Sequence, residues 1–288
     1  MQNHPDWPHF EALPFSSYSP LTAGTRGRGI GGLKLMPDDR YYGCCACIGA
    51  AGIGLVPKMH PLLSGNGIVL NLFIDGEITT QTPSGAPITL KTVTDYPCGG
   101  TVTFSLTLIA PESFTLSIRN PQWSKRSVLT VNGENVPVSD GYISMTREWK
   151  NKDRLSLSLD MRTEVIRPIP YGEMILMNKV IWGKNYMIST FDREDPSAHL
   201  HRAFRRGPLV LAQDERLGYS TKEAIKLQEN DDGTVDATVP KDSTVPFRHI
   251  LEVTLSLANG TSLTLVDYAS AGKLYTDEYK MAAWILTE

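Results

Sequence analysis

Residues 101–108, Thr-Val-Thr-Phe-Ser-Leu-Thr-Leu, alternate polar and apolar side chains with a period of two. This is the period of a strand that has one face on a core and the other face in water. The same alternation returns in stretches bounded by Gly, Pro, Asn or Asp, namely residues 67–74, 114–119 and 155–159. We therefore predict a series of half-buried antiparallel strands from about residue 66 onward.

A turn signal joins two of these strands. Asn132-Gly133 follows the apolar run Val-Leu-Thr-Val at residues 128–131 and precedes the polar pair Glu134-Asn135. Both central positions of a type I′ turn need positive φ, which Asn and Gly adopt readily. Short strands at such spacing, joined by tight turns, are typical of a β-sandwich.

The strand pattern breaks at Arg167-Pro-Ile-Pro and then resumes. Further strands are predicted near residues 207–211, 249–257 and 262–266, and a closing strand near residues 279–286. The sequence thus predicts a mainly β protein with antiparallel sandwich domains. We place a β-sandwich at residues 63–167 and a second β-rich, sandwich-like domain at residues 168–288.

Residues 1–62 have a different character. They are rich in Pro at the start and in Gly and Ala later, and they lack the apolar periodicity of an independent core. Glycine lowers helix propensity by about 1 kcal/mol per residue, so a helix formed after Cys47 needs neighbouring elements for stability. We expect an irregular or short-helical segment here.

Composition restricts the partners of the chain. Its 288 residues are 41% hydrophobic, which is enough for sizeable cores, and 28 basic against 31 acidic residues give a net charge of −3. This balance gives no reason to expect nucleic acid or an anionic membrane as a partner. The first residues form neither a basic nor an apolar leader, so we expect a soluble, cytoplasmic protein.

Cysteine spacing marks the candidate site. Cys44, Cys45 and Cys47 fall within four positions, whereas Cys98 lies far along the chain. This layout suits thiol or metal chemistry better than a disulfide framework, although small buried thiols in a Gly/Ala-rich packing element remain the alternative. We assign no function to Cys98.

Several short blocks occur in the same order as in glycoside hydrolase family 127, and together they give the chain its resemblance to that family. The resemblance extends from about Tyr18 to Trp284 and corresponds to the C-terminal half of the family. The blocks are Gly43-Cys-Cys, Tyr96-Pro97, Leu116-Ser-Ile-Arg-Asn-Pro-Gln-Trp, Val131-Asn-Gly, Gly141-Tyr, Arg147-Glu-Trp and Arg206-Gly-Pro-Leu-Val.

The resemblance implies a retaining β-L-arabinofuranosidase with a cysteine nucleophile bound to zinc. Carried over by position, Cys44 is the nucleophile and a metal ligand, Cys45 is a second ligand, and Cys47 adds a third sulfur where the family has Pro-Pro-Asn after its cysteine pair. Tyr18 is a weak match to an aromatic residue near substrate. Bound Zn²⁺ would hold the thiol as a thiolate, which can attack an anomeric carbon.

The resemblance also implies partners for these residues. In the family an upstream Glu-x-Cys pair completes the metal site, an upstream Glu acts as acid and base, and most of an (α/α)6 barrel precedes the cysteines. Residues 1–62 then correspond to the C-terminal strip of that barrel. Only Asp6, Glu11, Asp38 and Asp39 supply carboxylates before Cys44. We therefore expect no hydrolysis by this chain alone, and a partner in the form of the upstream half or a second copy.

Two further functions stay open. The sandwiches of a non-catalytic protein can bind carbohydrate or act as structural supports. A zinc-binding accessory domain without catalysis would bind about one metal ion per chain and cleave no glycoside. Zinc content distinguishes these two functions, and glycosidase turnover distinguishes both from the enzyme.

Overall fold

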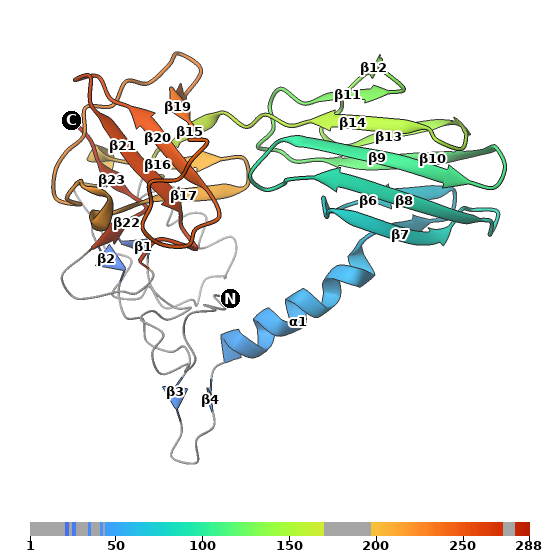
Figure 1. The fold of residues 1–288 in the computed structure, drawn as a ribbon, viewed down its shortest axis with the longest axis horizontal. Coiled ribbons are helices and arrows are strands. Elements are labelled where there is room, and N and C mark those ends of the chain that lie inside the picture. The colour runs from blue at the N-terminus through green and yellow to red at the C-terminus, as the bar shows by residue number, and fades with distance from the viewer. Residues whose placement is uncertain are drawn as a thin grey trace, which may run out of the picture. The chain divides into compact units, whose positions relative to one another are not determined.

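The computed structural model describes residues 51–169, 197–272 and 280–288, and before residue 51 it describes the backbone of one helix and four short strands. The chain divides into two compact units (Figure 1). Of the residues from 51 onward that the structure describes, the first unit contains 51–162 and 207–209. The second contains 163–169, 197–206, 210–272 and 280–288. The chain thus passes from the first unit to the second between Arg162 and Thr163.

The described strands of the first unit form two larger sheets. The four-stranded sheet has the order β13-β10-β6-β5 and the six-stranded sheet has the order β12-β11-β14-β9-β8-β7. The first sheet contains β5 (Leu62–Ser64), β6 (Gly67–Leu70), β10 (Glu112–Asn120) and β13 (Gly141–Trp149). The second contains β7 (Gly76–Gln81), β8 (Pro87–Thr94), β9 (Thr101–Leu108), β11 (Val128–Val131), β12 (Glu134–Val136) and β14 (Arg154–Ser158).

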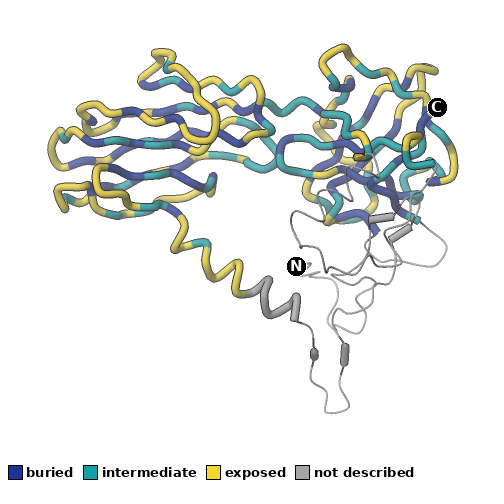
Figure 2. The backbone as a smooth tube through the Cα atoms, turned by 180° about the vertical axis from the view of Figure 1, so that it is seen from behind, coloured by how far each residue is buried: buried dark blue, intermediate teal, exposed yellow. Residues whose placement is uncertain are grey.

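One hydrophobic core lies between these two sheets. Alternate residues of β9 and of β10 are buried, as the period of two predicts, and they belong to the same cluster although they come from different sheets. The largest members of the cluster include Phe104 and Trp149, both at 0% exposure. Figure 2 shows the resulting alternation of buried and exposed positions along these strands. The predicted β-sandwich is confirmed for this unit.

The predicted turn at Asn132-Gly133 is also confirmed. It joins β11 to β12, with Val131 opposite Glu134 in the antiparallel register. Asn132 has φ 52° and Gly133 has φ 87°, so both central residues have positive φ. A hairpin turn of this kind matches the right-handed twist of its flanking strands.

One strand pair departs from the antiparallel pattern. β6 runs parallel to β10, with Gly67 opposite Thr115 and Leu70 opposite Ile118. A Cβ atom on Gly67 would lie 2.0 Å from the main-chain oxygen of Thr115, so only glycine fits this close backbone approach. The sequence marks residue 67 as the start of a strand but gives no sign of the parallel direction.

The described strands of the second unit form a nine-stranded sheet. Its main order is β18-β15-β16-β17-β21-β20-β19, and β22 and β23 pair with β17 and β16 outside that order. The strands are β15 (Thr163–Ile166), β16 (His201–Arg206), β17 (Leu209–Asp214), β18 (Thr234–Val235), β19 (Ala237–Thr238), β20 (Glu252–Ser256), β21 (Ser262–Asp267), β22 (Met281–Ala282) and β23 (Ile285–Leu286). The short 3-10 helices η2 (Ala198–Leu200) and η3 (Glu215–Leu217) precede β16 and follow β17.

The mainly β, antiparallel character predicted from the sequence is therefore confirmed. Before the sandwich lie the two-residue strands β1 (Leu21–Thr22), β2 (Thr25–Arg26), β3 (Lys34–Leu35) and β4 (Tyr41–Tyr42), followed by the helix α1 (Cys44–Met59). Where the sequence predicted an irregular or short-helical segment, the structure has a 16-residue helix that begins at Cys44. Over the part of the chain that the structure describes, no helix combines the length and apolar character needed to cross a bilayer.

Candidate functional site

The cysteine motif forms the first turn of α1. Cys44, Cys45 and Cys47 all have helical backbone, and the helix continues to Met59. Positions 44 and 47 are three residues apart and share one side of the helix, while position 45 lies about 100° around the axis. The cysteine side chains, like Tyr18, lie outside the described residues.

The second half of α1 is exposed. Residues 51–59 are exposed apart from the half-buried Val56 (yellow in Figure 2). Three large apolar side chains are among them, with exposed fractions of 66% for Ile53, 50% for Leu55 and 43% for Met59. This half of α1 therefore presents apolar side chains to solvent on a helix that also contains several glycines.

His60 anchors the end of α1 to the sandwich. The helix contains Pro57 and ends at Met59, and the next peptide bond, His60–Pro61, is cis. The His60 ring is buried, and its Nδ1 accepts a hydrogen bond from the main-chain N–H of Leu72 at 3.4 Å. Burial lowers the pKa of His60 from its usual 6.5, so the neutral ring that accepts this bond is favoured.

The described residues contain no cluster of metal-ligating side chains. Within these residues, no group of three or more His, Cys, Asp or Glu side chains has the arrangement needed to hold a metal ion. Cys98, in the β8–β9 connection, is half-buried and its N–H donates to the main-chain oxygen of Asp95 at 3.0 Å. His199 lies in η2 and His201 begins β16, so these two imidazoles do not share a strand.

Three carboxylates of the second unit are almost completely buried: Asp214 at 1%, Asp267 at 1% and Glu252 at 4% exposure. Each accepts hydrogen bonds from main-chain or side-chain donors of the same unit, which explains its burial without a ligand. Their donors include Arg216 Nε at 2.8 Å and Gly272 N at 2.9 Å for Asp214, Ile250 N at 2.8 Å and Ser270 N at 2.9 Å for Asp267, and Ser243 Oγ at 2.6 Å and Thr244 Oγ1 at 3.0 Å for Glu252. These carboxylates hold loops in place, and the alternation of the strands did not reveal them.

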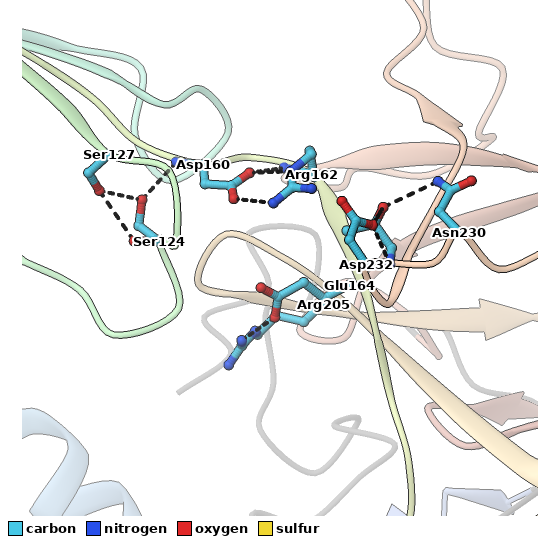
Figure 3. Close-up of polar contacts among 9 residues, drawn as sticks. Ser124, Ser127, Asp160, Arg162, Glu164, Arg205, Asn230 and Asp232 are labelled. Atoms are coloured by element: carbon cyan, nitrogen blue, oxygen red, sulfur yellow. Dashed lines mark hydrogen bonds and ion pairs between the residues drawn. The ribbon is translucent and has the colours of Figure 1, made fainter.

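Four polar residues, Ser124, Ser127, Asp160 and Arg162, are hydrogen-bonded to one another where the chain leaves the first unit (Figure 3). Ser124 Oγ accepts from the main-chain N–H of Asp160 at 2.8 Å and also contacts Ser127 Oγ at 2.7 Å. The Asp160 carboxylate accepts from Arg162 Nε at 2.9 Å and Nη2 at 2.6 Å. These bonds from Arg162 lower the pKa of Asp160. These bonds tie the chain that follows β14 to the segment that contains Ser124 and Ser127.

The outer face of the four-stranded sheet is rich in hydroxyl groups. Thr115 pairs with Thr146 and Ser117 with Ser144, each through side-chain oxygens 2.8 Å apart. Next to them, the 43% exposed Tyr142 donates its hydroxyl to Asn71 Oδ1 at 2.5 Å. Cross-strand hydroxyl pairs of this kind stabilise a sheet, and an exposed aromatic ring can also stack on a sugar.

Comparisons with known proteins agree with this architecture. Residues 67–161 match the family described as "Beta-L-arabinofuranosidase, GH127 middle domain". No curated protein matches the chain.

Among solved structures, a GH127 β-L-arabinofuranosidase from Geobacillus stearothermophilus T6 matches with a TM-score of 0.57 and 18% identity, over 90% of this chain and 42% of that one. A GH127 β-arabinofuranosidase matches with a TM-score of 0.59 and 18% identity over 85% and 39%. A structure titled "Glycoside hydrolase" matches with a TM-score of 0.57 and 22% identity over the same shares.

The chain spans less than half the length of these solved structures. At these identities the structural likeness establishes a shared fold, and the family match covers the first unit from the start of β6 to just beyond β14. The resemblance predicted from the sequence is thus confirmed: residues 67–161 carry the features of the GH127 middle domain, and most of the chain shares the fold of the corresponding part of GH127 enzymes.

Proposed function

We propose that this chain is the C-terminal portion of a retaining glycoside hydrolase of the β-L-arabinofuranosidase type, with Cys44 as its nucleophile. The match of residues 67–161 to the GH127 middle domain is the observation that carries the proposal. The cysteine motif adds to it because it lies on the helix that leads directly into this domain. The substrate class follows from the family description and from the titles of the matched structures.

The donor set of α1 fits a zinc ion in part. Zinc accepts thiolate ligands, and three cysteines fall within the first turn of this helix. Cys44 and Cys45 are the proposed ligands and Cys47 is a third candidate sulfur. When bound, the ion would keep the Cys44 sulfur as a thiolate at neutral pH.

The reaction of the proposed nucleophile is a double displacement. The Cys44 thiolate attacks the anomeric carbon, the bond to the leaving oxygen breaks, and a proton donor neutralises that oxygen. Water then releases the sugar from sulfur, with the same donor group acting as base. The helix N-terminus assists because its unpaired N–H groups favour negative charge on the first turn.

The acid/base group is proposed to come from polypeptide that covers α1. Exposed Ile53, Leu55 and Met59 provide the apolar surface for that contact. We therefore propose that residues 1–288 alone do not turn over substrate, and that activity requires the segment equivalent to the rest of the matched structures. The alternative is that a second copy of this chain covers α1.

The test is to measure zinc content and hydrolysis of a chromogenic β-L-arabinofuranoside by the purified chain, with and without the upstream half of a GH127 enzyme supplied in trans. The proposal predicts turnover only with both parts and its loss in Cys44→Ser, while Cys98→Ser serves as the matched control and retains activity. Turnover by the chain alone would overturn the proposed dependence. Full activity of Cys44→Ser in the combined sample would overturn the proposed nucleophile.

A second candidate is carbohydrate binding without catalysis, favoured by the exposed Tyr142 beside the hydroxyl pairs of β10 and β13. Isothermal titration with arabinan oligosaccharides tests it, comparing the native chain with Tyr142→Ala. The outward Val128 on the other sheet of the same unit, 49% exposed, provides the control substitution Val128→Ala. Binding that is equal in all three proteins would exclude this face.

A further inference from the structure

The chain contains three Asn-Gly pairs, at Asn66, Asn132 and Asn259. In such a pair the main-chain nitrogen of the glycine can attack the asparagine Cγ, because glycine leaves that nitrogen unshielded. The structure places the three pairs in different surroundings. We infer that Asn259 is the site at which this protein undergoes spontaneous deamidation, whereas Asn132 and Asn66 are protected by the fold.

Asn259 lies in the exposed connection between β20 and β21. Its Oδ1 accepts hydrogen bonds from Thr261 Oγ1 at 2.7 Å and from the main-chain N–H of Thr261 at 3.1 Å. These bonds form an Asx turn, which folds the side chain back over the following main chain. Both donors are directed at the oxygen that becomes negative when Cγ is attacked.

The attacking nitrogen of this pair belongs to Gly260. Its N–H donates to the main-chain oxygen of Leu257 at 3.0 Å within the turn, and the residue itself is exposed. Gly260 has φ 79°, and no atom lies within 4 Å of the position of an added Cβ. Hydroxide from solvent therefore reaches the N–H after one exposed turn bond opens.

Asn132 has the same sequence neighbour but both ends of its amide are held. Its Nδ2 donates to Asp153 Oδ1 at 2.8 Å, and its Oδ1 accepts from the main-chain N–H of Arg154 at 2.9 Å. Its own N–H donates to the main-chain oxygen of Arg154 at 2.8 Å. The bond to the Asp153 carboxylate holds the leaving nitrogen, so departure of Nδ2 requires a charge-assisted hydrogen bond to break.

Asn66 is protected by the position of its glycine in a sheet. Gly67 is buried at the start of β6, between β5 and β10. The main-chain oxygen of Asn66 accepts from Thr115 N at 3.0 Å, which fixes the peptide that would have to move. Ring closure there would displace the parallel pairing with β10.

The proposed step consumes water and releases ammonia. The Gly260 nitrogen loses its proton to hydroxide and bonds to Asn259 Cγ. The bond from Cγ to Nδ2 then breaks, and the nitrogen departs as ammonia after taking a proton from water. Water opens the resulting five-membered succinimide at either carbonyl, leaving aspartate or isoaspartate. No electron donor or acceptor is involved.

The product changes the end of the hairpin in two ways. Both products add a negative charge: aspartate has its carboxylate in place of the side-chain amide, whereas in isoaspartate the former main-chain carbonyl becomes the carboxylate and the main chain runs through Cγ, which adds a methylene to the backbone. Thr261 Oγ1 lies 2.8 Å from Tyr219 Oη, so displacement of this turn also moves a contact to the segment after η3. We expect local loosening of the β20–β21 hairpin in the isoaspartate form.

The test is to incubate the full native chain at mildly alkaline pH and to quantify the three Asn-Gly peptides by mass spectrometry, with an isoaspartate methyltransferase assay as a second readout. A sample in guanidinium chloride gives the reference rate of each pair without the fold. We expect similar rates at the three sites in the unfolded sample. In the native sample Asn259 should react at least about tenfold faster than Asn132 or Asn66, a difference of about 1.4 kcal/mol in barrier.

Thr261→Val tests the proposed activation, because it removes the Oγ1 donor and keeps the main-chain donor. We expect a severalfold slower reaction at Asn259, with Ser262→Ala as the control of unchanged rate. The deamidation rate of Asn132 in the same molecules reports on the fold, because a general loosening of the structure would raise that rate as well. Native-state conversion of Asn132 or Asn66 at the rate of Asn259 would overturn the site assignment. An unchanged Asn259 rate in Thr261→Val would overturn the activation.

Discussion

The indole Nε1 of Trp149 donates a hydrogen bond to the main-chain oxygen of Phe114 at 3.0 Å inside the sandwich. The bond joins β13 to β10, whose pairing places Phe114 opposite Arg147. Trp149 has no exposed surface, and its ring centroid lies 6.2 Å from that of Phe114. One residue therefore both fills the core and satisfies a main-chain acceptor of the neighbouring strand.

Substitution of Trp149 should separate these two contributions. We expect Trp149→Ala to lower the free energy of unfolding by about 3–5 kcal/mol, because it leaves a large cavity. Trp149→Phe should cost less, about 2 kcal/mol, because it retains a ring but leaves the Phe114 oxygen without its donor. Urea unfolding followed by circular dichroism measures both. Ile109→Ala, at a residue 80% exposed, is the control and should change stability by no more than about 0.5 kcal/mol. A similar effect at Trp149 and Ile109 would contradict the core assignment.

Two glycines of one hairpin provide a matched pair of substitutions. Gly67 faces the main-chain oxygen of Thr115, whereas Gly65 has no atom within 4 Å of an added Cβ. Gly67→Ala should therefore destabilise the protein by roughly 3 kcal/mol, because two backbones must move apart. Gly65→Ala should change the free energy of unfolding by no more than about 1 kcal/mol. Denaturant midpoints of the two variants check the difference, and equal midpoints would show that β6 does not lie against β10 as described.

The buried His60 predicts an acid-sensitive contribution to stability. Its folded-state pKa is lowered by burial, so the unfolded chain binds a proton more readily than the folded chain does. The contribution is fully present above the usual pKa of 6.5 and is lost as pH falls from there through the lowered folded pKa.

Unfolding curves at a series of pH values between neutral and acid measure this effect. His60→Gln should flatten the dependence below pH 6.5 relative to the native chain, because glutamine does not titrate. A steeper fall in the His60 variant would reverse the sign proposed here.

The sandwich was predictable from the sequence because strand alternation and turn chemistry are local. Residues 101–108 and 128–131 have the predicted strand bounds, and Asn132 and Gly133 have the φ values that a type I′ turn requires. The parallel direction of β6 was not predictable, since it depends on a strand more than 40 residues away along the chain. The buried Asp214, Glu252 and Asp267 were missed because their donors come mainly from turns and loops, which carry no periodic signal.

The candidate site was predictable only as far as its motif. Cys44, Cys45 and Cys47 stand out by spacing, and their placement in one helical turn agrees with a common role. The structure also shows that the second half of α1 is exposed. The composition had predicted only that a helix in this segment needs neighbouring elements for stability. Under the proposed function the acid/base group comes from other polypeptide, so it leaves no signal in this sequence.

Exposure of α1 leads to a prediction about its dynamics. A 16-residue helix containing Gly49, Gly52 and Gly54 is marginal without tertiary contacts, and residues 51–59 have little burial. Their amide hydrogens should therefore exchange rapidly in this chain alone. Upon addition of an upstream GH127 half, exchange should slow in α1, while the amides of β9 should stay protected in both samples.

Hydrogen exchange is measured by mass spectrometry on the native chain and on a variant of the α1 surface. The variant distinguishes docking of the upstream half on α1 from a stabilisation of α1 that does not involve this surface. Ile53→Lys together with Leu55→Lys places two charges on the apolar surface of α1. Because burial of each charge is costly, the concentration of upstream half needed to protect the α1 amides should rise at least about tenfold. Val93→Lys, at a residue 55% exposed on β8, is the matched control and should leave docking unchanged. Strong protection of α1 in the chain alone would mean that its cover lies within residues 1–288, and protection insensitive to both lysines would place the contact elsewhere.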